Sequence, residues 1–127
     1  MQNSKYSQDN IFAKIIRGEI PANKVYEDSD VLAFHDISPS APTHVLVIPK
    51  GEYLNFTEFS AKASASEIAH FFKKVGEIAA QLGIAESGFR IISNSGPNAH
   101  QTVPHFHVHI LAGKKMGPLL QSDNQLR

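Results

Sequence analysis

Three histidines alternate with large apolar residues in one short segment, His105-Phe106-His107-Val108-His109-Ile110-Leu111. Successive side chains of a β-strand point to opposite faces of a sheet. On a strand, the three histidines would therefore share one face, while Phe106, Val108 and Ile110 would face the core. A single histidine on a strand is usually a surface or hydrogen-bonded residue, but three with this spacing predict a functional site.

Two kinds of chemistry use histidines in such a row: metal binding and reaction at a phosphate. His105 and His109 would lie about 13 Å apart along a strand, too far for metal bonds of about 2.1 Å to reach one ion. A phosphate group fits better, because different neighbours can bind its separate oxygen atoms. A neutral imidazole, with an ordinary pKa of about 6.5, is a nucleophile at pH 7, and the central residue His107 is the candidate.

The elements that would position these histidines follow from hydrophobic periodicity. Asn10 can cap a short helix, and Ser64 begins a capping box in front of a long amphipathic helix that ends at Gly83. Apolar runs bounded by turn residues predict the strands. The predicted elements are a helix over 11–17, strands over 24–27, 31–36 and 44–49, the long helix over 65–82, and strands over 88–93 and 105–112. This order predicts an α+β fold in which the long helix packs on an antiparallel sheet.

Composition narrows the classes of function. The chain has 127 residues, no cysteine, and 12 basic and 12 acidic residues, so its formal net charge is zero. The absence of cysteine excludes disulfides, thiolate metal sites and cysteine nucleophiles. The absence of a basic surplus argues against a nucleic acid polymer as the partner.

The organisation of the chain is expected to be simple. No run of residues has the length and apolar character of a membrane span or a targeting segment, so we expect a cytoplasmic protein without a membrane partner. The length suits one domain. We expect a flexible N-terminus over 1–10, one domain over 11–113, and a tail over 114–127 in which the periodicity stops.

Four segments together resemble the histidine triad (HIT) family, and in particular its Hint branch of purine nucleoside phosphoramidate hydrolases. They are residues 11–21 (IFAKIIRGEIP), 32–39 (LAFHDISP), 41–50 (APTHVLVIPK) and 94–111 (NSGPNAHQTVPHFHVHIL). The resemblance runs in register from about residue 11 to residue 113. It implies a five-stranded antiparallel sheet with one long and one short helix, and a homodimer with a continuous sheet across the interface.

The resemblance also implies a reaction. His107 would attack the α-phosphorus of a nucleoside 5′-phosphoramidate and form a nucleotidyl-histidine, which water would then hydrolyse. The other ring nitrogen of His107 should donate to a fixed acceptor, for which the carbonyl group of His105 is the candidate. His44, His105 and His109 would surround the phosphate, and the hydroxyl group of Thr102 would help to protonate the leaving amine. The resemblance implies no metal ion and no cofactor.

The residues that resemble the family's substrate pocket come from both halves of the chain. Apolar side chains would enclose a flat purine base, Asp36 would accept hydrogen bonds from the ribose, and the loop before the histidines would contact phosphate or ribose. The expected substrate-binding residues are Ile11, Phe12, Ile15, Ile20, Phe34, His35, Asp36, Ile37, Asn94, His100, Gln101, Thr102, His107 and His109. The sequence departs from the Hint pattern where Thr102 replaces the usual serine, His100 a glycine and Pro104 an aromatic residue, so the substrate range can differ.

Two alternatives stay open at this point. The same nucleophile would serve a dinucleoside polyphosphate hydrolase or a nucleotidyl transferase of the same family. Alternatively, the histidines could bind a nucleotide or zinc without turnover, in a non-enzymatic interaction module. In each case the expected partner is small, a purine nucleotide or an ion.

Overall fold

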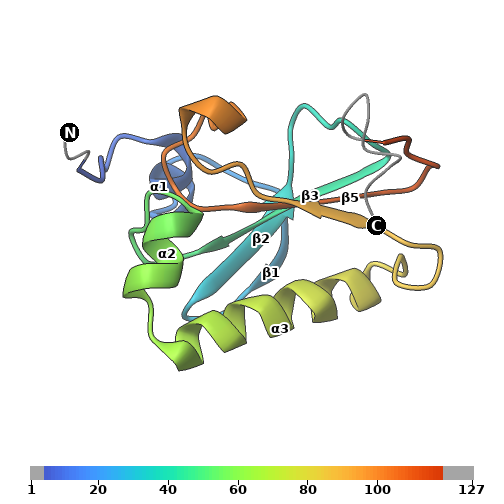
Figure 1. Cartoon of the computed structure of the whole chain (residues 1–127), viewed down its shortest axis with the longest axis horizontal. Helices are drawn as coiled ribbons and strands as arrows, with labels where there is room; N and C mark the ends of the chain where they lie inside the picture. Colours follow the sequence, from blue (N-terminus) through green and yellow to red (C-terminus); the bar gives the residue numbers. More distant parts are fainter. Residues whose placement is uncertain (1–4, 119–127) are drawn as a thin grey trace.

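The computed structural model describes residues 5–118 and combines α-helices with one β-sheet (Figure 1). In chain order the elements are α1 (Ile11–Ile16), β1 (Lys24–Glu27), β2 (Val31–His35), β3 (Thr43–Pro49), α2 (Phe56–Lys62), α3 (Ala65–Gln81), β4 (Arg90–Ile92), a short 3₁₀ helix (Pro97–Ala99) and β5 (Val108–Ala112). The predicted flexible N-terminus and tail reach beyond this range, because residues 1–4 and 119–127 lie outside the described residues.

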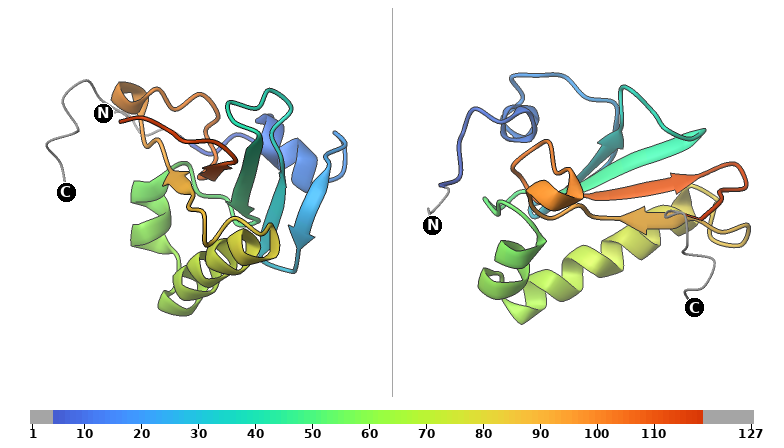
Figure 2. Two further views of the ribbon diagram at one scale, coloured as in Figure 1. Left: turned by 90° about the vertical axis from the view of Figure 1, so that its right-hand side faces the viewer. Right: turned by 45° about the horizontal axis from the view of Figure 1, so that its top comes forward.

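The five strands form one antiparallel sheet in the order β1-β2-β3-β5-β4. The helices α2 and α3 cover one face, and α1 lies over the opposite face (Figure 2). The predicted α+β fold with a five-stranded antiparallel sheet is therefore confirmed. Within residues 5–118, no helix combines the length and the apolar character needed to cross a membrane.

Side-chain caps begin all three α-helices. The side chain of Asn10 accepts a hydrogen bond from the backbone of Ala13, and Ser64 accepts one from Glu67, as the sequence predicted. Helix α2, which Asn55 caps in the same way, was not predicted from the sequence. This helix has seven residues, of which only Phe59 is buried, so it carries no apolar stripe that a periodicity could detect.

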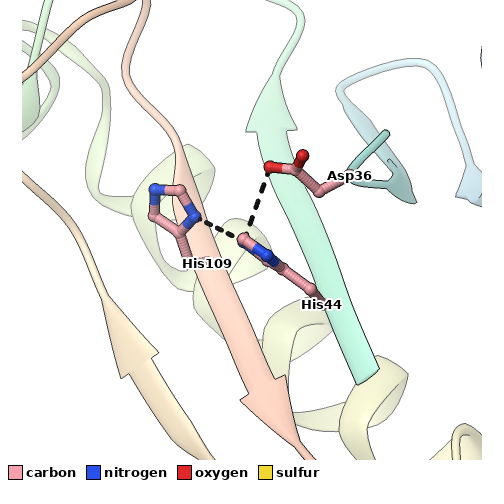
Figure 3. Close-up of side chains that lie close together, drawn as sticks. All are labelled: Asp36, His44 and His109. Atoms are coloured by element: carbon pink, nitrogen blue, oxygen red, sulfur yellow. Dashed lines mark hydrogen bonds and ion pairs between the residues drawn. The ribbon is translucent and has the colours of Figure 1, made fainter. Parts of the chain in front are cut away.

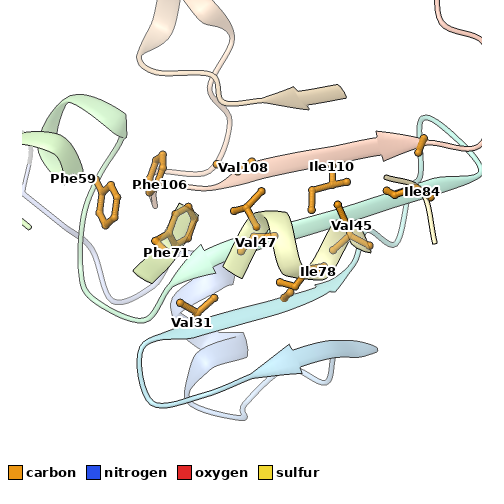
Figure 4. Close-up of a cluster of buried hydrophobic side chains, with 14 residues drawn as sticks. Val31, Val45, Val47, Phe59, Phe71, Ile78, Ile84, Phe106, Val108 and Ile110 are labelled. Atoms are coloured by element: carbon orange, nitrogen blue, oxygen red, sulfur yellow. The ribbon is translucent and has the colours of Figure 1, made fainter. Parts of the chain in front are cut away.

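The larger hydrophobic core lies between the sheet and the helices α2 and α3 (Figure 4). Its sheet side includes Phe106, Val108 and Ile110, which are all buried, so the apolar alternation in the histidine segment does face the core as predicted. Phe59 stacks on Phe106 with ring centroids 4.6 Å apart. The core therefore fixes the backbone that carries the histidines.

A second hydrophobic cluster lies on the opposite face of the sheet, under α1. It consists of Phe12, Ile15, Leu32, Phe34, Leu46 and Ile48. Strands β2 and β3 contribute alternate residues to the two cores, which is why they are apolar at nearly every position. The histidines point to this second face, beside α1.

The histidine strand is shorter than predicted. Its ladder with β3 begins at Val108, so His105 and His107 precede the strand rather than lying in it. The backbone amide of Phe106 instead donates to the carbonyl group of Tyr53, in the segment before α2. This bond directs residues 105–107 toward α2 and away from the β3–β5 ladder.

Candidate active site

A cavity of about 280 Å³ opens beside the histidines, between α1, the end of β2 and the segment that leads into β5. Its lining residues are Ile11, Phe12, Ile15, Ile20, Pro21, Ala22, Phe34, His35, Asp36, Ile37, Leu46, Thr102, Val103, His107 and His109. The volume lies just below the range of about 300–1,000 Å³ for ligand pockets, and most of the wall is apolar.

His107 is fixed so that one ring nitrogen is free. Its Nδ1 atom lies 2.7 Å from the carbonyl oxygen of His105, which can only accept, so Nδ1 carries a proton and donates it. This is the hydrogen bond that we expected from the sequence. Burial lowers the pKa of His107, which keeps the ring neutral at pH 7. The Nε2 atom therefore has an unprotonated lone pair, on a side chain that lines the cavity.

His44 and His109 form a second histidine pair (Figure 3). The backbone amide of Ser40 donates to Nδ1 of His44 over 3.0 Å, so the proton of neutral His44 is on Nε2. This Nε2–H lies 2.9 Å from Nδ1 of His109 and 3.5 Å from a carboxylate oxygen of Asp36. Burial, with His107 and His44 nearby, lowers the pKa of His109 to about 4. Neutral His109 consequently accepts at Nδ1 and keeps its proton on Nε2, where it can donate to a ligand.

His105 is completely buried and does not line the cavity. Its Nε2 atom lies 2.8 Å from the carbonyl oxygen of Pro49, and its Nδ1 atom lies 2.5 Å from the hydroxyl group of Tyr6. Burial lowers the pKa of His105 to about 4. The His105 ring therefore lies outside the cavity lining, and the backbone carbonyl group of His105 accepts the hydrogen bond from the His107 ring.

The same geometry bears on metal binding. The ligand atoms of Asp36, His44 and His109 all lie within 4.8 Å of one another, which is close enough for one ion. However, the Ser40 amide requires His44 to carry its proton on Nε2, the atom that would have to bind the ion. If this proton moved to Nδ1, the Nδ1–H group of His44 would face the backbone N–H group of Ser40, and neither could accept a hydrogen bond from the other. The hydrogen bonds thus favour an anion near His109 over a cation.

Most of the predicted pocket residues do meet in space. Ile11, Phe12 and Ile15 come from α1, Ile20 follows it, and Phe34, His35, Asp36 and Ile37 come from the end of β2. The cavity also has four lining residues that sequence reasoning missed: Pro21, Ala22, Leu46 and Val103. All four are small or apolar, so the sequence carried no separate chemical signal for them; Leu46 pairs with the predicted Phe34 across β2 and β3.

The loop before the histidines contributes less than expected. Among its predicted ligand contacts, Thr102 lines the cavity, whereas Asn94, His100 and Gln101 do not. The Gln101 amide oxygen accepts from the backbone of Gly96, and its nitrogen donates to the carbonyl groups of Leu54 and Val103. Gln101 thus braces the loop. His100 is exposed, in the left-handed region with a φ of 62°, at the end of the 3₁₀ helix.

Comparison with known proteins shows to which family this chain belongs. The family model of the HIT domain matches residues 17–116. The chain belongs to the HIT family. It is 55% identical over 115 residues to an uncharacterized 13.2 kDa HIT-like protein of Azospirillum brasilense, a match that covers 91% of this chain and 94% of the relative. It is also 43% identical over 114 residues to the purine nucleoside phosphoramidase of Escherichia coli K12, with 90% and 95% covered.

Solved structures of HIT proteins have the same fold. A HIT family hydrolase from Clostridium thermocellum matches with a TM-score of 0.81 and 44% identity, over 88% of this chain and 96% of the other. A histidine triad protein from Clostridium difficile matches with a TM-score of 0.79 and 43% identity, with the same shares covered. In this HIT protein, the triad is His105, His107 and His109, and the structure gives each of them a different hydrogen-bonding role.

Proposed function

We propose that this HIT protein hydrolyses the P–N bond of purine nucleoside 5′-phosphoramidates, with His107 as the nucleophile. The observation that carries the proposal is the free Nε2 lone pair of His107 beside an apolar cavity, with the Nδ1 proton bound to the His105 carbonyl group. The 43% identity to a purine nucleoside phosphoramidase supports the same substrate class.

The first step transfers the nucleotidyl group to the enzyme. The His107 Nε2 lone pair attacks the α-phosphorus, a bond forms between nitrogen and phosphorus, and the P–N bond to the amine breaks. The amine leaves with the electron pair of that bond and takes up a proton, which the hydroxyl group of Thr102 relays from water. The Nε2–H group of His109 donates to a phosphoryl oxygen and stabilises its developing negative charge.

The second step releases the product. Water attacks the phosphorus, the bond to Nε2 breaks, and the nucleoside monophosphate leaves with the oxygen from water. The proton that this water loses passes to solvent and replaces the one that the amine took up in the first step. The electron pair returns to Nε2, while the proton stays on Nδ1 and the Nδ1–H group donates to the His105 carbonyl oxygen throughout. The site therefore returns to its starting protonation state without any rearrangement of the ring.

The nucleoside end of the cavity suits a flat base with little base selectivity. Apolar side chains from α1 and β2 form its walls, and such walls recognise shape more than hydrogen-bonding pattern. Asp36 lies in the lining between this apolar part and His109, and one of its oxygens already accepts from the backbone of Ser38. This bond fixes the carboxylate, and its remaining lone pairs accept from the ribose hydroxyl groups.

A dinucleoside polyphosphate would use the same nucleophile with a different leaving group. The cavity lining contains no lysine or arginine, so it offers no permanent positive charge for a chain of further phosphates. This observation favours the phosphoramidate. Comparing initial rates on adenosine 5′-phosphoramidate and on a diadenosine polyphosphate distinguishes the two substrates, and a faster polyphosphate reaction would reverse the assignment.

Intact-mass measurement after rapid quenching tests the mechanism. Wild-type protein mixed with adenosine 5′-phosphoramidate should gain the mass of one adenylyl group, and His107→Ala should show neither this adduct nor release of the monophosphate. His100→Ala is the matched control, because this exposed histidine does not line the cavity. Wild-type release of monophosphate without any adduct, or release by His107→Ala at the wild-type rate, would disprove the covalent route.

We further propose that the protein is a homodimer joined through β4, an edge strand of the sheet. Three apolar side chains are exposed on β4 and the surface next to it: Phe56, Phe72 and Ile91. Ile91, on β4 itself, has 49% of its surface accessible. Light scattering should give twice the chain mass for wild type and a lower mass for Ile91→Lys, whereas Ala80→Lys, on an exposed face of α3, should behave as wild type. A monomeric wild type would refute the dimer. The cytoplasmic location stays a prediction.

A further inference from the structure

We propose that Tyr6 is a positioning residue for the reaction, because its hydroxyl group holds His105 in the one arrangement from which the His105 carbonyl group orients His107. This inference rests on the proposed role of His107 as nucleophile. Tyr6 is not among the residues of the sequence motifs, and it precedes the family-model match, which begins at residue 17. It comes from the stretch 5–10, in a region that the sequence predicted to be flexible.

The hydrogen bonds of His105 determine where its proton lies. The carbonyl oxygen of Pro49 can only accept, so the Nε2 atom facing it at 2.8 Å carries the proton. Neutral His105 then has a bare lone pair at Nδ1, and the Tyr6 hydroxyl group at 2.5 Å donates to it. The two rings meet edge to face, with centroids 5.5 Å apart. Tyr6 thus satisfies an acceptor on a completely buried ring.

The position of the His105 backbone determines the orientation of the His107 ring. The Nδ1–H group of His107 donates to the backbone carbonyl of His105 over 2.7 Å. Any shift of the backbone at residue 105 therefore moves the acceptor that orients the proposed nucleophile. Phe12 adds a second constraint, since its ring meets His107 edge to face with centroids 5.0 Å apart. A chain of contacts therefore runs from Tyr6 through His105 to His107.

The segment that carries Tyr6 is itself attached to the fold. The Gln8 amide nitrogen donates to the Glu52 carboxylate over 2.5 Å, and Arg17 donates to the Gln8 amide oxygen over 3.2 Å. The Asn10 amide nitrogen donates to the carbonyl of Ser7 over 2.8 Å, while the oxygen of the same side chain caps α1. These bonds hold the segment across the buried histidine, and they continue into the helix that lines the cavity.

Tyr6 does not line the cavity, so its effect on turnover should be separate from an effect on substrate binding. Loss of the hydroxyl group would leave the His105 Nδ1 lone pair without a donor, inside a site that water does not reach. The His105 ring would then exchange tautomers or rotate to find a donor, and the backbone of residue 105 would shift with it. The His105 carbonyl group would consequently hold His107 less well. A lower kcat with little change in KM is the expected signature.

The test compares Tyr6→Phe with Tyr26→Phe, which removes a hydroxyl group that donates to Asp28, away from the cavity. For adenosine 5′-phosphoramidate, Tyr6→Phe should lower kcat about tenfold and change KM by less than about twofold, whereas Tyr26→Phe should alter neither. Gln8→Ala, which loosens the segment but keeps the hydroxyl group, should lie between wild type and Tyr6→Phe. Wild-type kcat in Tyr6→Phe would overturn the proposal.

A second measurement needs no turnover and separates this inference from the proposed function. Nitrogen-15 NMR of the histidine rings should show His105 of the wild-type protein protonated at Nε2 only, with an Nδ1 shift that moves in Tyr6→Phe and stays in Tyr26→Phe. If the His105 nitrogen shifts are the same in wild type and Tyr6→Phe, Tyr6 does not act through His105, whatever the kinetics. If the shifts move but no variant hydrolyses any phosphoramidate, the contact stands and the proposed reaction fails.

Discussion

The Nε2 atom of His44 and the Nδ1 atom of His109 lie 2.9 Å apart, although 64 residues separate the two in the chain. The antiparallel register explains this contact: His44 pairs with Leu111, and Leu46 pairs with His109, so the two histidines are diagonal neighbours on one face of the β3–β5 ladder. Diagonal neighbours are within reach of long and aromatic side chains. The ladder therefore sets the orientation of His109, the histidine that we propose donates to the phosphate.

Replacing His44 should impair turnover through His109. His44→Phe removes the N–H group that donates to His109 Nδ1, so the proton on His109 is no longer confined to Nε2, and kcat should fall about tenfold. His44→Gln keeps an N–H donor at a similar distance from the backbone and should retain more of the activity. Steady-state kinetics on adenosine 5′-phosphoramidate provide the measurement. Equal rates for both variants would show that the donor to His109 is unimportant.

Thr102 should matter most for strongly basic leaving groups. Thr102→Val keeps the shape of the side chain but removes the hydroxyl group, so hydrolysis of an alkylamine phosphoramidate should slow by about tenfold or more. An arylamine leaves with less need for a proton and should be affected less. Thr102→Ser keeps the hydroxyl group and serves as the control. A uniform loss over both amines would assign Thr102 a role in binding rather than in proton transfer.

Acid should destabilise the protein before its carboxylates titrate. The unfolded pKa of a histidine is about 6.5, whereas burial lowers the pKa of folded His105 to about 4, so the unfolded state binds more protons between these values. The free energy of unfolding should therefore be highest above pH 6.5 and fall as the pH is lowered, by about 2 kcal/mol for the completely buried His105 and by less for the half-buried His109, between pH 7.5 and pH 5. His109, with a folded pKa of about 4, adds in the same direction.

Urea unfolding at these two pH values measures the effect. His109→Gln removes one of the two histidines whose folded pKa is about 4, so its stability should depend less on pH than that of the wild type. The ion-paired Glu27 does not confuse the comparison, since its contribution is lost only as the pH falls from its unfolded pKa of about 4.5 toward its folded pKa of about 2, below the range measured. A stability that is constant from pH 7.5 to pH 5 would contradict the neutral, buried state of these rings.

Phe59 should support the site from the core. Phe59→Ala leaves a cavity under the ring of Phe106, which stacks on it at 4.6 Å, and should lower the free energy of unfolding by about 3–5 kcal/mol. Thr57→Ala, at an exposed position of the same helix, should cost less than about 1 kcal/mol. Thermal or urea unfolding checks both variants, and equal losses would show that burial of Phe59 is not what stabilises this region.

Sequence reasoning worked where a local pattern determines the structure. Alternation placed Phe106, Val108 and Ile110 in the core, and the side chains of Asn10 and Ser64 correctly marked two helix starts. It failed where the deciding contact is tertiary. Nothing in the local sequence says that the Gln101 amide is occupied by backbone groups, or that His100 points away from the cavity.

The same limit applies to the surroundings of the histidines. The sequence showed three histidines with a two-residue period, but it did not show that His105 turns toward Pro49 and Tyr6 while His107 lines the cavity. No local pattern shows that the ring nitrogen of His70 donates to Asp28 at the turn between β1 and β2. Tyr6 lies too far from the motif in the chain for any spacing rule to connect it with His105.

The alternation of residues 105–110 between two faces of the sheet also restricts how this segment can change in evolution. Phe106, Val108 and Ile110 fill the core on the side of α3, while His107 and His109 face the cavity. Inserting or deleting a single residue here would exchange the two sets, placing imidazoles among phenylalanines and an aromatic ring where the nucleophile stands. Stability and chemistry would be lost together, so gaps of one residue are excluded here, although exchanges of similar size among the apolar residues can be tolerated.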